Sequence, residues 1–165
     1  MDISFKMEEG RFNYRACAVI IHDGKILAMQ DGCSPYYYLP GGRVHLHEDA
    51  ARAVLREVKE ELEIDAEIIR PLWFNQGFFV EDVTGERFHE ICLYYLMDIS
   101  KSDLLSRGEK FTLQEGKHRH TFAWLEFGRL QSEYFYPLFL KKRIFDIPET
   151  LTILAEYEQL GGKSL

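Results

Sequence analysis

The sequence predicts a mixed α/β (α+β) domain in which a central β-sheet lies between α-helices. Short, β-rich apolar runs separated by turn residues dominate the first three quarters of the chain. One strongly periodic helical segment interrupts them, and helix-like stretches follow at the end. The 165 residues are 46% hydrophobic and contain no linker, low-complexity run or repeat. We therefore expect one domain covering residues 1–165.

The first elements predict a β-hairpin. Residues 15–21 and 25–30 have strand composition, and the intervening His22-Asp23-Gly24 contains the Asp-Gly pair that favours positive φ in a tight turn. Residues 35–40, "PYYYLP", are expected to be extended because a residue before proline avoids the helical region. About fourteen residues precede this first predicted strand.

A helix is predicted from Ala50 to Leu62, with Asp49 as its N-cap. Its apolar residues recur at about 100° per residue and form one stripe. The stripe consists of Ala51, Val54, Leu55, Val58 and Leu62.

The remaining elements follow from composition. Strands are predicted at residues 66–74, 77–80, 87–97 and 120–127, and the polar segment Asp98–Arg119 is expected to be mostly loop. Helices are predicted near residues 137–145 and 148–160. A mixed sheet flanked by helices accommodates this order of elements.

Charge and targeting signals restrict the partners and the compartment. The net charge is −7, which argues against a nucleic-acid backbone as the main partner. No apolar run approaches 18 residues, so no membrane span is expected, and the N-terminus lacks the apolar region of a signal peptide. Cys17, Cys33 and Cys92 are odd in number and lack CxxC spacing. We expect them to be reduced, buried thiols of a cytoplasmic protein.

Three glutamates on the predicted helix indicate a metal site. Glu57, Glu60 and Glu61 are spaced i, i+3, i+4 and share one face, which the helical arithmetic places opposite to or beside the apolar stripe, away from the core. Carboxylate oxygens suit Mg²⁺ or Mn²⁺. The Gly41-Gly42 turn lets backbone approach the helix and offers a carbonyl ligand. A solvated acidic helix face is the alternative reading.

The same segment resembles the sequence box of the Nudix hydrolases (MutT-like), G-x5-E-x7-R-E-U-x-E-E-x-G-U, where U is a bulky aliphatic residue. Eight of its nine defined positions match without a gap. The matching residues are Gly42, Glu48, Arg56, Glu57, Val58, Glu60, Glu61 and Ile64. The preceding "LPGG" is also similar to the family, and the order of strands is compatible with it over most of the chain.

This resemblance implies a Nudix fold and hydrolysis of the pyrophosphate bond in a nucleoside diphosphate linked to another group. Water attacks one phosphorus, Mg²⁺ or Mn²⁺ neutralises the phosphate oxygens, and a carboxylate orients or deprotonates the water. The implied metal ligands are Glu57, Glu60, Glu61 and the Gly41 carbonyl. Arg56 would orient Glu57, while Gly42 and Glu48 would support the site.

One box position departs from the family. Glu63 stands where the family has a glycine, at a helix end where positive φ is common. A glutamate there costs about 1 kcal/mol if φ is positive. We therefore expect a modified helix end, with more effect on local stability than on catalysis.

Further site residues are expected from later segments. Some family members use a glutamate from a later loop as a catalytic group. Glu115 is our candidate for it and Glu90 is its competitor. An ordinary loop carboxylate and a cross-strand ion pair are their respective alternatives. His118, Arg119 and His120 are candidate phosphate contacts.

Other residues allow two readings each. The alternating pairs His45/His47 and His118/His120 suggest zinc, but no third ligand is evident. Several aromatic residues are candidates for stacking a base, although most are expected in the core. They are Tyr36, Tyr37, Tyr38, Trp73, Phe74, Phe78 and Phe79.

The substrate stays open at this stage. Nucleoside triphosphates compete with ADP-ribose and nucleotide sugars, because the box handles only the diphosphate. The short N-terminal region weakly favours a compact pyrophosphatase over a swapped dimer, although a homodimer is possible. A non-catalytic nucleotide-sensing module of the same fold is disfavoured because Arg56, Glu57, Glu60 and Glu61 are all present. A plain interaction domain would require the box spacing to be accidental.

Overall fold

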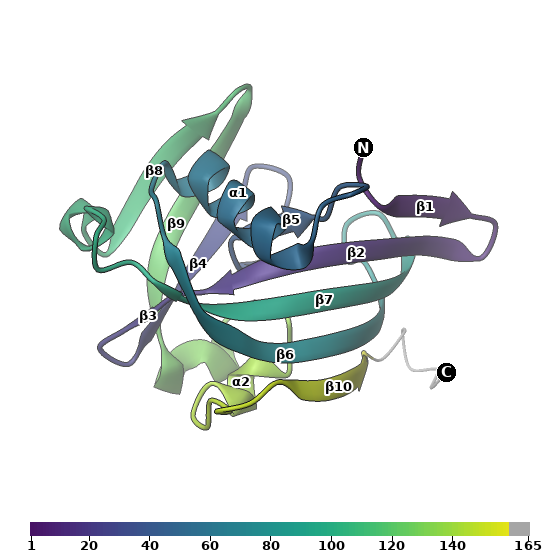
Figure 1. Cartoon of the computed structure of the whole chain (residues 1–165). Helices are drawn as coiled ribbons and strands as arrows, with labels where there is room; N and C mark the ends of the chain where they lie inside the picture. Colours follow the sequence, from purple (N-terminus) through teal and green to yellow (C-terminus); the bar gives the residue numbers. More distant parts are fainter. Residues whose placement is uncertain (159–165) are drawn as a thin grey trace.

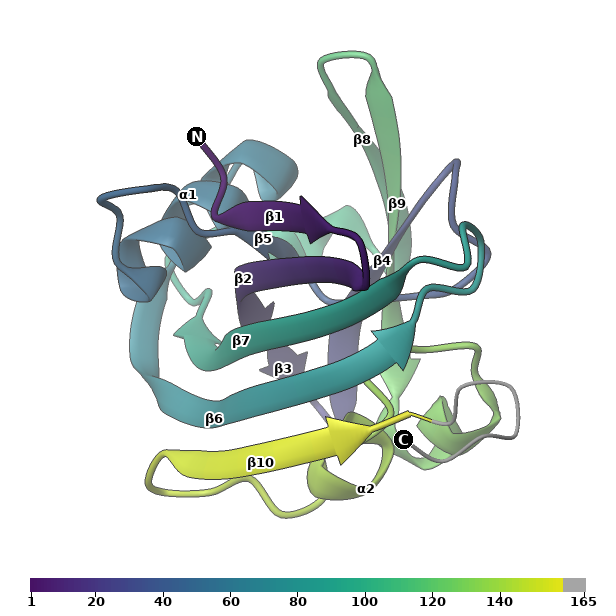
Figure 2. The ribbon, with the colours of Figure 1, turned by 90° about the vertical axis from the view of Figure 1, so that its right-hand side faces the viewer.

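The computed structural model describes residues 1–158, which form two β-sheets with helices packed on their faces (Figure 1). The larger sheet has the order β1-β2-β7-β6-β10, with β5 paired to β2 (Figure 2). Its strands are β1 (Ser4–Met7), β2 (Gly10–Val19), β5 (Gly41–Arg43), β6 (Glu67–Val80), β7 (Arg87–Asp98) and β10 (Thr152–Tyr157). The pairs β2/β7 and β6/β10 are parallel and β6/β7 is antiparallel, so the sheet is mixed.

The second sheet is antiparallel and has the order β3-β4-β9-β8. Its strands are β3 (Ile21–His22), β4 (Lys25–Asp31), β8 (Lys110–Glu115) and β9 (His118–Glu126). The helical elements are α1 (Ala50–Leu62), η1 (Leu104–Arg107), η2 (Phe127–Ser132) and α2 (Leu140–Arg143). Among the described residues, no helix combines the length and the apolar character needed to cross a lipid bilayer.

Alternation along β2 divides the core into two layers. Ala16 and Ala18 pack in the cluster that contains the buried face of α1. Cys17 and Val19 point to the other side, where residues of η2 and α2 cover the sheet. The predicted α+β class, with a central mixed sheet between helices, is confirmed.

Helix α1 begins and ends where the sequence predicts. Asp49 is the N-cap and accepts a hydrogen bond from the Arg52 N–H. The buried stripe, however, is rotated from the predicted one, because Ala50 and Ala53 are buried while Leu55 is 37% exposed. This rotation turns Glu61 inward, where it is only 7% exposed. The prediction that the glutamate face points away from the core is therefore wrong for Glu61.

Several boundaries differ from the prediction. Strands β1 and β2 begin at Ser4 and Gly10, so the N-terminal segment is already sheet. The two strands predicted at residues 66–74 and 77–80 are one strand, β6. The loop predicted at 98–119 contains η1 and β8. The apolar–polar alternation of a strand is weak in β8, because only Phe111 and Leu113 are apolar and its other residues are polar.

The predictions of two C-terminal helices are mostly wrong. The predicted helix at 137–145 is reduced to the four residues of α2. Within the predicted helix at 148–160, residues 152–157 form β10, and positions 159–160 lie outside the described residues. Leu, Ala and Glu favour helix in "TILAEY", but parallel pairing with β6 overrides that preference.

The cysteines follow the expectation in part. Cys17 and Cys92 are buried free thiols with their sulfur atoms 3.5 Å apart. Cys33 is exposed, contrary to the expectation of burial, because it lies in the turn that follows β4.

Glu63 adopts a left-handed backbone conformation of the kind that glycine favours at a helix end. Its φ is 56° and its ψ is 34°, and its N–H donates to the Lys59 carbonyl as the C-cap. The expected modification of the helix end is therefore wrong, and the left-handed conformation is retained with a side chain present.

Glu63→Gly is expected to raise the free energy of unfolding by about 1 kcal/mol, because glycine adopts positive φ without a Cβ penalty. For a chain of this size the midpoint of thermal unfolding should rise by about 2–4 °C. Glu63→Ala is the control, since it removes the carboxylate and keeps the Cβ. An equal rise for both variants would contradict the backbone explanation.

Candidate functional site

The Gly41-Gly42 pair is the point at which α1 comes closest to the sheet. A Cβ on Gly41, whose φ is +146°, would lie 2.3 Å from the Ala16 carbonyl oxygen. A Cβ on Gly42 would lie 2.3–2.6 Å from the carboxylate atoms of Glu57. A side chain at either position would therefore collide with a neighbouring group. Gly41 lets β5 pack on β2, and Gly42 leaves the space in which the Glu57 carboxylate sits.

Glu61 completes this contact from the same helix. Its Oε2 accepts a hydrogen bond of 3.1 Å from the Gly41 N–H. Burial, and then the charge of Glu57, raise the pKa of Glu61 well above its usual value. Burial likewise raises the pKa of Glu57. Two carboxylates are thus held close together in a place that disfavours their ionised forms.

Arg56 fixes the outer side of this arrangement. Its Nε and Nη2 donate to the two oxygens of Glu48 at 2.8 and 2.9 Å, and its Nη1 donates to Glu57 Oε1 at 2.6 Å. The Arg56 bonds lower the pKa of Glu48 to about 2. Arg56 also donates to the Arg43 carbonyl at 3.1 Å, which ties the helix to β5. The predicted contact of Arg56 with Glu57 is present.

Glu60 does not join Glu57 and Glu61. Its side chain is 47% exposed and lies 3.3 Å from Arg56 Nη1. Within residues 1–158, no three His, Cys, Asp or Glu side chains are grouped so that they could hold a metal ion. The expected convergence of three carboxylates is therefore absent from this arrangement of side chains.

The residues that are present nevertheless fit a hard divalent cation. Glu57 and Glu61 supply carboxylate oxygens, and Gly41 supplies a carbonyl oxygen. A cation bound between the two carboxylates would favour their ionised forms and offset the effect of burial and mutual repulsion. Glu60 would have to leave Arg56 to take part.

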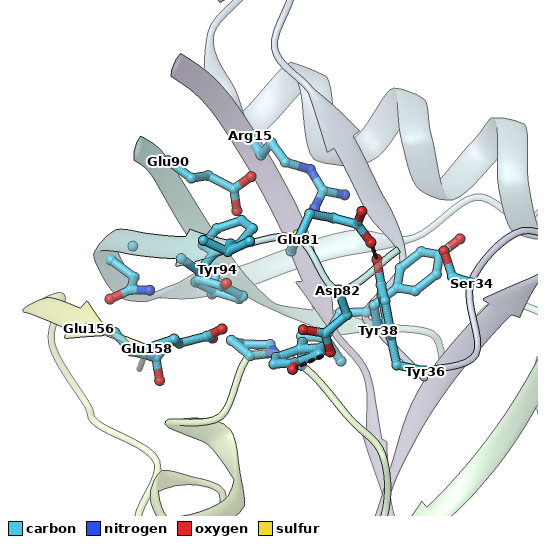
Figure 3. Close-up of a pocket in the computed structure, with 18 of the residues that line it drawn as sticks. Arg15, Ser34, Tyr36, Tyr38, Glu81, Asp82, Glu90, Tyr94, Glu156 and Glu158 are labelled. Carbon is cyan, nitrogen blue, oxygen red and sulfur yellow. Dashed lines mark hydrogen bonds between the residues drawn. The ribbon is translucent and has the colours of Figure 1, made fainter. Parts of the chain in front are cut away.

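A cavity of about 330 Å³ opens beside this site, on the face of the sheet opposite α1 (Figure 3). Arg15 joins the two regions, because it lines the cavity and donates from Nη2 to the Gly41 carbonyl at 3.4 Å. Six carboxylates line the cavity, whereas Arg15 is the only basic residue among its described lining residues. The carboxylates belong to Asp31, Glu81, Asp82, Glu90, Glu156 and Glu158.

Tyrosine hydroxyls satisfy three of these carboxylates. Tyr38 donates to Asp31 and Tyr36 donates to Glu81, both at 2.8 Å. Tyr136 donates to Asp82 at 2.7 Å. These bonds hold aromatic rings along one wall of the cavity, as Figure 3 shows for Tyr36 and Tyr38.

Glu90 and Glu115 occupy different places. Glu90 lines the cavity, and its Oε2 is 3.4 Å from Asn13 Nδ2. Glu115 lies at the end of β8 and contacts His120 Nε2 at 2.9 Å, outside the described lining. Of the two candidates for the later catalytic glutamate, Glu90 therefore lies at the cavity and Glu115, the preferred one, does not.

The predicted phosphate contacts are likewise remote from the lining. His118 and Arg119 are exposed on β9, and His120 is 8% exposed against Phe122. None of the three lines the cavity. The predicted stacking residues divide in the same way, since Tyr36, Tyr38 and Phe79 line it while Trp73 is fully buried in the core.

Sequence reasoning missed most residues of the cavity, among them Arg15, Asn75, Glu156 and Glu158. Arg15 carried a signal, because it is a charged residue directly before the fully buried apolar run of β2. Glu156 and Glu158 carried none, because their segment was taken as helix and the pairing of β10 with β6 depends on distant parts of the chain.

Comparison with known proteins identifies the class. Residues 12–141 match the model of the NUDIX domain, which is most of the chain. The chain therefore belongs to the Nudix family. A protein of Caenorhabditis elegans named "Putative nudix hydrolase 1" is 32% identical over an 88-residue alignment that covers 44% of this chain and 24% of that protein. The chain thus spans about a quarter of that relative's length.

Solved structures share the fold. A MutT NUDIX hydrolase from Burkholderia pseudomallei aligns with a TM-score of 0.51 and 24% identity over 81% of this chain and 94% of that one. A MutT protein from Bacillus halodurans gives 0.61 and 13% over 89% and 90%. An ADP-ribose pyrophosphatase from Streptococcus suis gives 0.55 and 18% over 87% and 98%. At these identities the likeness establishes the fold alone.

Glu158→Gln is expected to flatten the pH dependence of stability. Burial, followed by the charges of Glu156, Asp82 and Glu90, raises the pKa of Glu158 from 4.5 to about 8. Between these values the folded state binds more protons than the unfolded state, so stability falls as pH rises through this window. The variant lacks this loss. Its thermal midpoint should match the wild type near pH 4 and exceed it increasingly up to about pH 8.

Glu149→Gln serves as the control for this measurement, because the Glu149 side chain is 90% exposed and lies outside the cavity lining. Parallel pH profiles for the wild type and Glu158→Gln would show that Glu158 ionises normally in the folded protein.

Proposed function

We propose that this chain is a Mg²⁺- or Mn²⁺-dependent hydrolase of the pyrophosphate bond in a nucleoside diphosphate linked to a further group. One observation carries the proposal. Glu57 and Glu61 are held against the Gly41-Gly42 backbone beside a cavity that Arg15 also lines. Membership of the Nudix family supports the same chemistry.

Within this proposal each residue has a defined task. The metal, when bound, neutralises phosphate oxygens and lowers the pKa of the attacking water. Glu57, Glu61 and the Gly41 carbonyl would hold it, and Arg56 orients Glu57 while Glu48 holds Arg56. Arg15 lines the cavity next to Gly41 and is placed to contact a phosphate there.

A carboxylate must also orient or deprotonate the water. Glu60 is the accessible carboxylate on the same face of α1 and is our candidate, because Glu115 is engaged with His120 on the β8–β9 hairpin. Substrate enters the cavity beside Tyr36 and Tyr38, which are placed to stack on a base.

The surroundings of the protein are part of the proposal. Cys17 and Cys92 are close and unpaired, which supports a reducing compartment such as the cytoplasm. A small nucleotide is the expected partner, since the net charge of −7 disfavours a nucleic-acid backbone.

Glu61→Gln is expected to lower kcat on any hydrolysed nucleotide by about 10²–10³-fold, because it removes one charge at the site where phosphate charge is neutralised. The variant should also lose the rise in thermal midpoint that Mg²⁺ or Mn²⁺ gives the wild type. Glu63→Gln is the matched control, since it removes the same charge from an exposed position at the end of the same helix. Wild-type turnover that is equal with Mg²⁺ and with a chelator would refute metal dependence.

Gly42→Ala tests the placement of the carboxylate without changing its charge. The new Cβ would occupy the present position of the Glu57 carboxylate, and a flexible side chain can move away at little cost in stability. We expect a nearly unchanged thermal midpoint with turnover and Mn²⁺ affinity each reduced at least about tenfold, as for a displaced ligand or its support. Wild-type affinity and turnover in this variant would show that the close approach has no role.

A further inference from the structure

The far end of the cavity is a floor made by three neighbouring strands, and its side chains are hydrogen-bond acceptors. In the sheet, Gly77 on β6 is paired with Glu90 on β7 and with Glu156 on β10. Neighbouring strands are about 4.8 Å apart, so the two glutamates flank Gly77 with their Cα atoms about 10 Å from each other. Gly77 places no side chain between them, so two carboxylates face an open space.

Two more acceptors border this space. Glu158 follows β10 two residues after Glu156 and lines the same cavity; Figure 3 shows the two glutamates side by side. Asn75 lies two residues before Gly77 on β6, is 4% exposed, and lines the cavity. Its Oδ1 has no hydrogen-bond partner among the described residues. A buried amide oxygen without a donor is costly, which indicates that a ligand supplies one.

Arg15, the only basic residue among the described lining residues, lies beside Glu90, whereas Glu156 and Glu158 lie apart from it (Figure 3). Within residues 1–158, neither Glu156 nor Glu158 forms a salt bridge or accepts a hydrogen bond of 3.5 Å or less from another side chain. The Phe139 backbone N–H donates to the Glu156 carboxylate, and this bond only partly offsets the effect of burial on its pKa. Burial raises the pKa of both carboxyls, as expected for acids without a cationic partner. Asp31, Glu81 and Asp82, in contrast, are satisfied by tyrosine hydroxyls.

We propose that this floor binds a positively charged organic group, an ammonium or a heteroaromatic cation, carried by the nucleotide substrate. The proposal rests on the hydrolase function proposed above and adds the chemical class of its substrate. An organic cation suits this space better than a second metal ion, because the cavity of about 330 Å³ with tyrosine walls accommodates a bulky cation.

Substrates matched except for charge test the proposal. One arm compares CDP-choline and CDP-ethanolamine with CDP-glycerol, which places the charge on the linked group. The other compares 7-methylguanosine diphosphate with guanosine diphosphate, which places it on the base. In at least one arm we expect wild-type kcat/KM, measured with Mg²⁺, to favour the cation by about tenfold. Glu156→Gln and Glu158→Gln should each reduce that preference, and Glu149→Gln should not.

A resident ammonium gives a second test. Gly77→Lys would place one between Glu90 and Glu156, and a Cβ at Gly77 meets only ordinary contacts of 3.7–3.8 Å. We expect it to abolish the preference for the cationic substrate. Gly77→Met occupies similar space without charge, so it should weaken both substrates and keep their ratio above one. Equal losses of preference in the two variants would indicate steric blocking and contradict the charge argument.

Binding separates this inference from the hydrolase function. The dissociation constants of the same nucleotide pairs are measured by calorimetry on the Glu61→Gln variant, in which slow turnover leaves the nucleotides intact. If the cationic nucleotides bind more tightly but the wild type hydrolyses none of them, the proposed hydrolase function is wrong and the proposed cation site is supported. Equal dissociation constants for the cationic and neutral nucleotides in both arms would contradict the proposed cation site, whatever the turnover.

Discussion

The close contact between the Gly41-Gly42 strand and the carboxylates of α1 is the constraint on which the site depends. Gly42 has no Cβ, so the Glu57 carboxylate lies against β5, and the Gly41 N–H holds Glu61. Helix α1 must bury Ala50, Ala53, Val54, Val58 and Leu62 to reach this position. Packing energy thereby holds two carboxyl groups together where burial raises the pKa of both, and a divalent cation bound there would offset this effect.

Gly41 also connects the two parts of the site. Its N–H contacts the box helix, and its carbonyl accepts from Arg15, which lines the cavity on the other face of the sheet. A diphosphate at this junction would lie between the carboxylates of α1 and the guanidinium of Arg15. The nucleoside and the linked group would then extend along the tyrosines towards Gly77 and the acidic floor. In this account the diphosphate is hydrolysed beside Gly41, and the cavity binds the groups attached to it.

Local patterns were sufficient to predict α1, its N-cap and the Arg56–Glu57 contact, because all three depend on residues within one or two turns of the same helix. The direction of Glu61 was not predictable in this way, since a modest rotation of the buried stripe decides whether that carboxylate faces solvent or β5. The cavity was also not predictable from local sequence patterns. Its floor exists only because β10 pairs with β6, 79 positions away in the register of Thr152 and Trp73.

Anomalous diffraction from crystals grown with millimolar Mn²⁺ tests the central claim most directly. The account predicts a strong manganese peak in contact with carboxylate oxygens of both Glu57 and Glu61, with Glu60 turned from Arg56 towards the ion. The same peak should be absent in the Glu61→Gln variant. Full manganese occupancy elsewhere, or none at the Gly41-Gly42 contact at that concentration, would contradict the account.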